Sequence, residues 1–212
     1  MVCAICGVRR PKRHCPGVGG EICSVCCGTE REVTVSCPFD CAYLQDSRRH
    51  EKQGDLDPER LPDRDIRVSD DFLNGHEELL ISLGRIVAEA ALETSGAVDF
   101  DVRDALSALV RTYRTLQSGV YYETRPDNAL AGRIYRGVQE RLDKFRAEER
   151  RRLGMPKTSD SDILNSLVFW ERLEFGRNNG RRRGRAFIGL LRTLLEAQEG
   201  SAEPRESLLV FP

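Results

Sequence analysis

Hydrophobic residues recur at intervals of three and four positions along most of the chain after residue 69. This spacing puts them on one face of a helix, and it predicts amphipathic helices joined by short loops. The predicted helices cover about residues 69–96, 99–119, 127–152, 160–176 and 185–199. Since no run here has the alternation of a long strand, we expect an all-helical bundle of about five helices.

Two of these helices carry further signals. Ser69 suits a helix N-cap, and Asp70 and Asp71 place acidic groups in the first turn, where the helix dipole favours them. His76 is expected as an exposed residue near this helix start. The helix over 160–176 is apolar on more than one side, which favours a central position in the bundle, although one face could instead be reserved for a partner.

The first 41 residues follow a different pattern, with few large hydrophobic side chains and all eight cysteines of the chain. A segment this small cannot build a sufficient core by itself and needs cross-links or metal ions. Disulfides require an oxidising compartment. The start Met1-Val2-Cys3 leaves no room for a signal peptide, so we expect a cytoplasmic location, and therefore metal.

Two cysteine pairs have the spacing of zinc ligands. Cys3 and Cys6 form one C-x-x-C pair, and Cys23 and Cys26 form the other. The glycine that follows the first pair lets the chain turn so that backbone N–H groups point at the sulfurs.

A third pair, Cys37 and Cys41, surrounds Pro38, a residue that suits the first position of a helix. We therefore expect Cys37 as the N-cap and Cys41 one turn later on the same face. A helix N-terminus favours thiolates. This helix is expected to continue to about Gln53 and to stop at Gly54.

Eight sulfurs suffice for two tetrahedral four-cysteine zinc sites. The preferred assignment is interleaved, with Cys3, Cys6, Cys23 and Cys26 at one ion and Cys15, Cys27, Cys37 and Cys41 at the other. A second assignment exchanges Cys26 and Cys27 between the sites. The spacing also allows a single zinc ion, held by the two C-x-x-C pairs or by one of them and the third pair. His14, next to Cys15, could replace a sulfur.

The order of two knuckles and then a helix-borne pair over residues 3–41 resembles the cross-brace and treble-clef zinc modules, in particular binuclear fingers of the HIT, MYND and B-box kinds. The chain departs from them in its lone Cys15 and in lacking their C-terminal histidine ligand. Such fingers commonly act through protein contacts, so the resemblance implies a binding role.

These patterns divide the chain into four parts. Residues 1–53 form the zinc-binding module with its C-terminal helix, and 54–69 a polar linker with two prolines. Residues 70–199 form the bundle, and 200–212 a tail that is either frayed or tucked into a groove. No stretch has the roughly 20 apolar residues of a membrane span, so no membrane partner is expected.

Charge adds one candidate site. The chain has 212 residues and a net charge of −1, which excludes a polycation. Five arginines nevertheless fall within nine residues between the last two predicted helices: Arg177, Arg181, Arg182, Arg183 and Arg185. Arginine forks beside a helix N-terminus suit phosphate, so this loop is a candidate anion or nucleic-acid site. A solvated charged loop is the alternative.

No catalytic constellation is found. The predicted bundle has a single histidine, His76, and lacks the two Glu-x-x-His motifs of a di-iron bundle. The preferred hypothesis is a cytoplasmic, bacterial, non-catalytic protein in which zinc folds the module and the bundle mediates protein–protein interaction or self-association. The alternatives are a nucleic-acid-binding regulator and a zinc–thiolate redox sensor.

Overall fold

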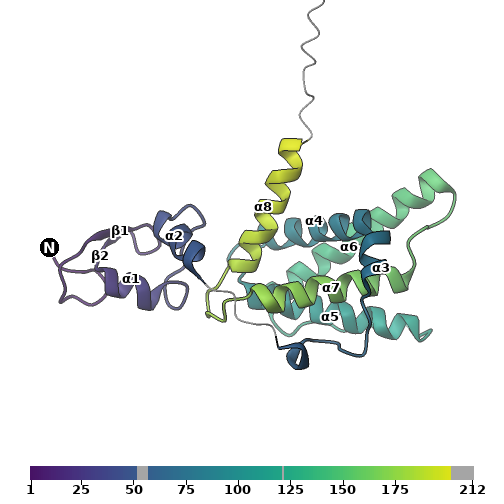
Figure 1. Cartoon of the computed structure of the whole chain (residues 1–212), viewed down its shortest axis with the longest axis horizontal. Helices are drawn as coiled ribbons and strands as arrows, with labels where there is room; N and C mark the ends of the chain where they lie inside the picture. Colours follow the sequence, from purple (N-terminus) through teal and green to yellow (C-terminus); the bar gives the residue numbers. More distant parts are fainter. Residues whose placement is uncertain (52–56, 121, 202–212) are drawn as a thin grey trace, which may run out of the picture.

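The computed structural model describes residues 1–51, 57–120 and 122–201. It confirms the predicted fold class, since a small cysteine-rich N-terminal module precedes a mainly helical region. Figure 1 shows the module at one end of the molecule, next to the loop that joins the last two helices of the bundle.

The N-terminal module combines a short hairpin with two short helices. Strands β1 and β2 pair antiparallel, with His14 opposite Glu21. The elements are β1 (Arg13–Cys15), β2 (Gly20–Ile22), α1 (Ser24–Glu30) and α2 (Ala42–His50). Their core is small: Ile22, Val35 and Leu44 are its buried aliphatic side chains among the described residues, and cysteines make up most of the rest.

Helix α2 begins later than the sequence predicts. Pro38 starts a turn, closed by a bond from the Cys41 backbone N–H to the Pro38 carbonyl (3.2 Å), so the expected N-cap role of Cys37 is wrong and Cys41 is the N-cap. Phe39, inside this turn, lies under the guanidinium of Arg185, 3.9 Å from ring centre to Cζ. That contact draws the turn onto the bundle. The predicted stop at Gly54 lies outside the described residues.

The bundle contains six helices in the described part of the chain. They are α3 (Asp70–Gly75), α4 (Glu77–Glu93), α5 (Asp99–Gln117), α6 (Ala129–Leu153), α7 (Asp160–Arg177) and α8 (Ala186–Ser201). The last four agree with the predicted helices to within two residues at each end. Ser69 caps α3 as predicted, accepting a bond from the Phe72 backbone N–H (3.2 Å).

The single helix predicted over residues 69–96 is wrong, because the chain breaks at His76. There the backbone leaves the helical region (φ −126°, ψ 28°), and the imidazole stacks on Phe72 with ring centres 4.4 Å apart. The ring also lies 3.5 Å from an Asp162 carboxylate oxygen. His76 is therefore half-buried and holds the α3–α4 corner against α7, whereas the sequence suggested an exposed residue.

Helix α7 occupies the central position that the sequence favours. Its buried side chains include Ile163, Leu167 and Trp170, and the helix packs against α4, α5 and α8. The Trp170 indole N–H donates to the Leu80 carbonyl of α4 (3.0 Å). The indole also lies flat against Gly84, where an added Cβ would meet Trp170 at 2.1 Å. A glycine is therefore required at this α4–α7 crossing.

The segment predicted as a polar linker is partly packed on the bundle. Its described part includes a 3₁₀ turn, Pro58–Arg60. The Arg172 guanidinium donates to the carbonyls of Pro62, Asp63 and Ile66, at 3.1, 2.8 and 2.8 Å. Arg172 therefore holds this stretch against α7. In the described part of the chain, no helix combines the length and the apolar character needed to cross a membrane.

Replacing Gly84 tests the crossing of α4 and α7. Gly84→Ala inserts a methyl group where Trp170 already lies, so we expect a loss of about 1–3 kcal/mol in the free energy of unfolding, measured by urea titration. Gly132→Ala in α6 is the matched control, because the nearest atom to its added Cβ is 3.8 Å away. That control should be neutral or slightly stabilising; equal losses in both variants would contradict the close packing.

Glu171 predicts a pH dependence of stability. Burial, together with the neighbouring Asp63 carboxylate, raises the pKa of Glu171 to about 8 from an ordinary value of 4.5. Between these values the unfolded chain is ionised at this residue while the folded chain keeps its proton, so this group makes stability fall as pH rises. Glu171→Gln should flatten that fall, seen as a smaller difference between urea midpoints at pH 5.5 and pH 8. An unchanged difference would contradict the assignment.

Candidate metal centre and its junction with the bundle

Four cysteines of the module converge on one point. The sulfurs of Cys3, Cys6, Cys23 and Cys26 all lie within 4.8 Å of one another, and Cys3, Cys23 and Cys26 are buried. Sulfurs at the corners of a tetrahedral zinc–thiolate site are about 3.8 Å apart, given Zn–S bonds of about 2.3 Å. The cluster is therefore close to the geometry of a four-cysteine metal site.

Local backbone geometry creates this convergence. Gly7 takes a left-handed conformation (φ 65°) and its N–H donates to the Cys3 carbonyl (2.8 Å), which closes the first knuckle. Cys23 is the N-cap of α1, so its sulfur accepts from the Cys26 backbone N–H (3.4 Å). The second C-x-x-C pair therefore lies at a helix N-terminus. The sequence analysis predicted a helix N-terminus only at the third pair.

The sulfurs of this cluster differ in how readily they ionise. Backbone N–H donation, first from Cys6 and then from Cys23, lowers the pKa of Cys3 to about 6. Burial, and then the neighbouring sulfurs, raise the pKa of Cys26 to about 12. Four thiolates at this point therefore need a cation among them. A metal ion held here would supply that charge, and four sulfur donors are a set that zinc prefers.

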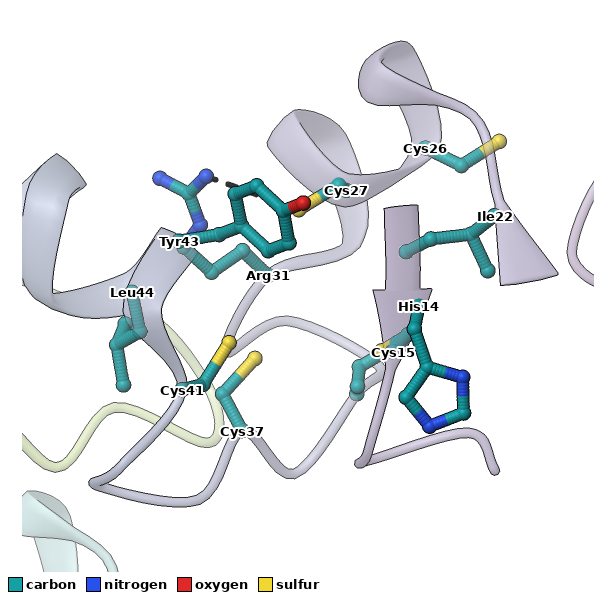
Figure 2. A pocket seen from close by; sticks show the side chains of 11 residues that line it. His14, Cys15, Ile22, Cys26, Cys27, Arg31, Cys37, Cys41, Tyr43 and Leu44 are labelled. Carbon is teal, nitrogen blue, oxygen red and sulfur yellow. Dashed lines mark hydrogen bonds between the residues drawn. The ribbon is translucent and has the colours of Figure 1, made fainter. Parts of the chain in front are cut away.

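The other four cysteines, Cys15, Cys27, Cys37 and Cys41, line a common cavity. Figure 2 shows the sulfurs of Cys37 and Cys41 side by side and directed into this cavity, with Cys15 and Cys27 around it. Among the described residues, the close-packed group that could hold a metal ion is the first cluster alone. The second set of four cysteines lines a cavity, and its sulfurs are less closely packed.

Adjacent cysteines serve opposite sides of α1. Cys26 belongs to the close-packed cluster, whereas Cys27 faces the second cavity. In Figure 2 the Cys26 sulfur points away from Cys37 and Cys41, and the Cys27 sulfur lies on their side. The close-packed group is the one that the interleaved assignment gives to a single ion. It is also the group of the alternative in which the two C-x-x-C pairs hold the only zinc ion.

Two arginines, neither of which the sequence indicated as a neighbour of the sulfurs, lie beside Cys27 at the second cavity. Arg13 Nη1 lies 3.3 Å from the Cys27 sulfur, and Arg31 Nη2 lies 3.8 Å from it. The Arg13 guanidinium also stacks on Tyr43, 4.5 Å from the ring centre. If the four thiolates here held a divalent ion, the site would carry a net charge of −2, which the two guanidiniums would offset. Arg13 reaches Cys27 from strand β1, and the Tyr43 ring that stacks on its guanidinium comes from α2.

His14 is placed unfavourably for a ligand. Its ring is largely exposed, its Nδ1 lies 3.2 Å from Glu21 Oε1 across the hairpin, and Figure 2 shows it directed away from Cys37 and Cys41. The imidazole therefore belongs to the surface of the hairpin.

The module is joined to the bundle through one buried carboxylate, Glu32. The side chain is 1% exposed, and its backbone is left-handed (φ 54°). Its Oε1 accepts from Arg48 Nη2 (2.8 Å) and from the Arg185 backbone N–H (3.1 Å), and its Oε2 accepts from Asn179 Nδ2 (2.9 Å). Its carbonyl accepts from the Arg183 backbone N–H (2.7 Å).

The arginine-rich loop over 177–185 is the bundle's side of this junction. Arg181 Nη1 donates to the Arg31 carbonyl (3.1 Å), and Arg183 Nη1 donates to the Ser36 hydroxyl (2.7 Å). Arg185 lies on Phe39, while Arg177 and Arg182 are exposed. Three of the five predicted anion-binding residues therefore contact the cysteine-rich module.

The helix N-terminus beside this loop also has a carboxylate of its own. Asp99, buried at the start of α5, accepts from the backbone N–H groups of Phe187 and Ile188 at the start of α8, both at 3.0 Å. Burial raises the pKa of Asp99 in spite of these bonds. The N–H groups that the sequence offered to an external anion are thus bound within the chain.

Comparisons of the chain with protein-family models, with curated proteins and with solved structures give no match. The case for its function therefore rests on its own residues.

Glu32→Ala should weaken the junction. It removes a buried carboxylate and leaves its donors without partners, so we expect a loss of about 2–4 kcal/mol in the free energy of unfolding. Urea titration followed by circular dichroism measures this loss. Glu21→Ala is the matched control, since its pair with His14 is exposed, and it should change stability by under about 0.5 kcal/mol. A loss for Glu32→Ala as small as that of the control would contradict the role given to this carboxylate.

Proposed function

We propose that this is a non-catalytic zinc-binding protein, in which two structural zinc ions fold the module over 1–53 and the bundle over 70–199 mediates protein–protein interaction or self-association. The observation that carries the proposal is the convergence of four cysteine sulfurs, Cys3, Cys6, Cys23 and Cys26, within 4.8 Å of one another. The second zinc ion would be held by Cys15, Cys27, Cys37 and Cys41.

The small core of the module supports a structural role for zinc, because the module needs another source of folding free energy. The module's buried aliphatic side chains are too few for a stable core, and structural zinc contributes on the order of 10–16 kcal/mol of apparent folding free energy. The order of knuckle, helix-borne pair and second sulfur set is similar to a cross-brace or treble-clef module. Arg13 and Arg31 beside Cys27 are suited to a site with net negative charge. Reduced thiols of this kind fit a cytoplasmic location.

The bundle is the better candidate for the interacting part. An apolar groove lies between α4, α7 and α8, and Ile81 and Leu194 on its sides are 44% and 39% exposed. Exposed apolar surface of this kind is typical of sites that bind protein segments. The nucleic-acid alternative loses support, because Arg181, Arg183 and Arg185 contact the module and Asp99 binds the start of α8.

Native mass spectrometry of protein purified without chelator tests the zinc assignment. We expect two zinc ions per chain. Cys6→Ser and Cys41→Ser should each lose one ion, because each removes a ligand from a different cluster. His14→Ala is the matched control and should keep two, since its ring points away from the sulfurs.

A count of one zinc in the unaltered protein would contradict the second site. It would leave up to four free thiols and would favour the redox-sensor hypothesis. No metal, with disulfides in its place, would contradict the whole zinc proposal.

A further inference from the structure

The groove between α4, α7 and α8 has a mainly apolar lining that comes from the bundle alone. It has a cavity volume of about 330 Å³, room for several aliphatic side chains. Its floor and walls include Leu80 and Ile81 of α4, Phe169 and Leu173 of α7, and Leu190 and Leu194 of α8. A water-filled groove with such a lining leaves apolar surface unburied, which favours an apolar occupant.

A suitable segment follows directly in the chain. Helix α8 ends at Ser201, and residues 202–212, outside the described part, contain Leu208, Leu209, Val210 and Phe211 in succession. We propose that residues 208–211 occupy the groove between α4, α7 and α8 of the same chain. This inference rests on the proposed function only because both treat the bundle as the interacting part of the chain. It adds the class of ligand, which is an apolar peptide segment.

The lengths fit this return path. Leu194 lies seven residues before Ser201 in α8, a distance of about 10 Å along the helix axis. Six residues lie between Ser201 and Leu208, and the seven steps from one Cα to the next span up to about 23 Å when extended, so the chain is long enough to reverse and run back along α8. In Figure 1, α8 lies beside α4 where it leaves the bundle, so a returning segment meets the groove that these helices form.

Proximity and charge favour the chain's own segment. A connection this short gives an effective concentration of about 1 mM, so even a weak apolar contact is occupied most of the time. The connection carries Glu203, Arg205 and Glu206, a net charge of −1. The charged residues of the groove lining are Glu77, Arg85 and Arg177, a net charge of +1, and Arg85 also lies 3.7 Å from Glu89. The two net charges have opposite signs.

The test uses the full chain and a labelled peptide of residues 202–212. Leu209→Asp with Phe211→Asp, in the full chain, should empty the groove, and the peptide should then bind with a Kd in the range of about 10–100 μM by fluorescence anisotropy. The unaltered protein should bind the peptide at least about tenfold more weakly, because its own segment competes at about 1 mM.

Two matched controls locate the site. Adding Ile81→Asp to the emptied chain should abolish peptide binding, whereas adding Leu153→Asp should not, since Leu153 is exposed at the end of α6 and is not part of the groove. A peptide with the same two aspartates should not bind.

Three results would overturn the proposal. The first is no peptide binding to the emptied chain, and the second is equal binding to the emptied and unaltered chains. The third is a dimer in the unaltered protein that the two aspartates convert to a monomer, since the segment would then occupy a second copy. None of these variants alters a cysteine, so the zinc count stands or fails separately.

Discussion

The structure depends on one buried glutamate, whose carboxylate accepts three hydrogen bonds and whose backbone carbonyl accepts a fourth. Glu32 lies between the cysteine-rich module and the bundle, and its side chain and carbonyl accept bonds from α2 and from the loop before α8. A carboxylate can be this deeply buried only when its lone pairs are satisfied and a positive charge is close, which Arg48 provides.

The contacts at this junction change how the arginine-rich loop is interpreted. Taken as a sequence, five arginines beside a helix start suggest an anion site. In the folded chain, Glu32 and Asp99 provide the anions from within, and Phe39 provides an aromatic face for Arg185. The positive charge of the loop is thus largely used to hold two small units together, which is the role expected where each unit has limited apolar surface to offer the other.

Much of the helical part could be predicted, because apolar spacing and caps are local signals. Ser69 caps its helix as expected, and α5 to α8 follow their hydrophobic periodicity. The break at His76 could not be predicted, since it comes from contacts with Phe72 and Asp162, and the latter is far away in sequence. Cys41 in place of Cys37 as the N-cap has the same origin, in the contact of Phe39 with the bundle.

The cysteine set was readable because ligand spacing is also local, and the convergence of the two C-x-x-C pairs agrees with the preferred grouping. Sequence reasoning did not place Glu32, Arg13 or Arg31 at these sites, because they act through partners brought near by folding. Glutamate has no particular preference for a left-handed backbone, and an arginine in a strand is unremarkable by itself, so neither carried a signal.

Cys26 and Cys27 share a peptide bond yet face opposite clusters. Under the proposed assignment, an ion that binds at either cluster fixes the backbone of α1 and thereby orients one ligand of the other. Because the first ion would already have ordered the backbone of α1, binding of the second ion would have a smaller entropic cost. The two sites would therefore load cooperatively, and partly metallated chains would be scarce at intermediate zinc concentrations.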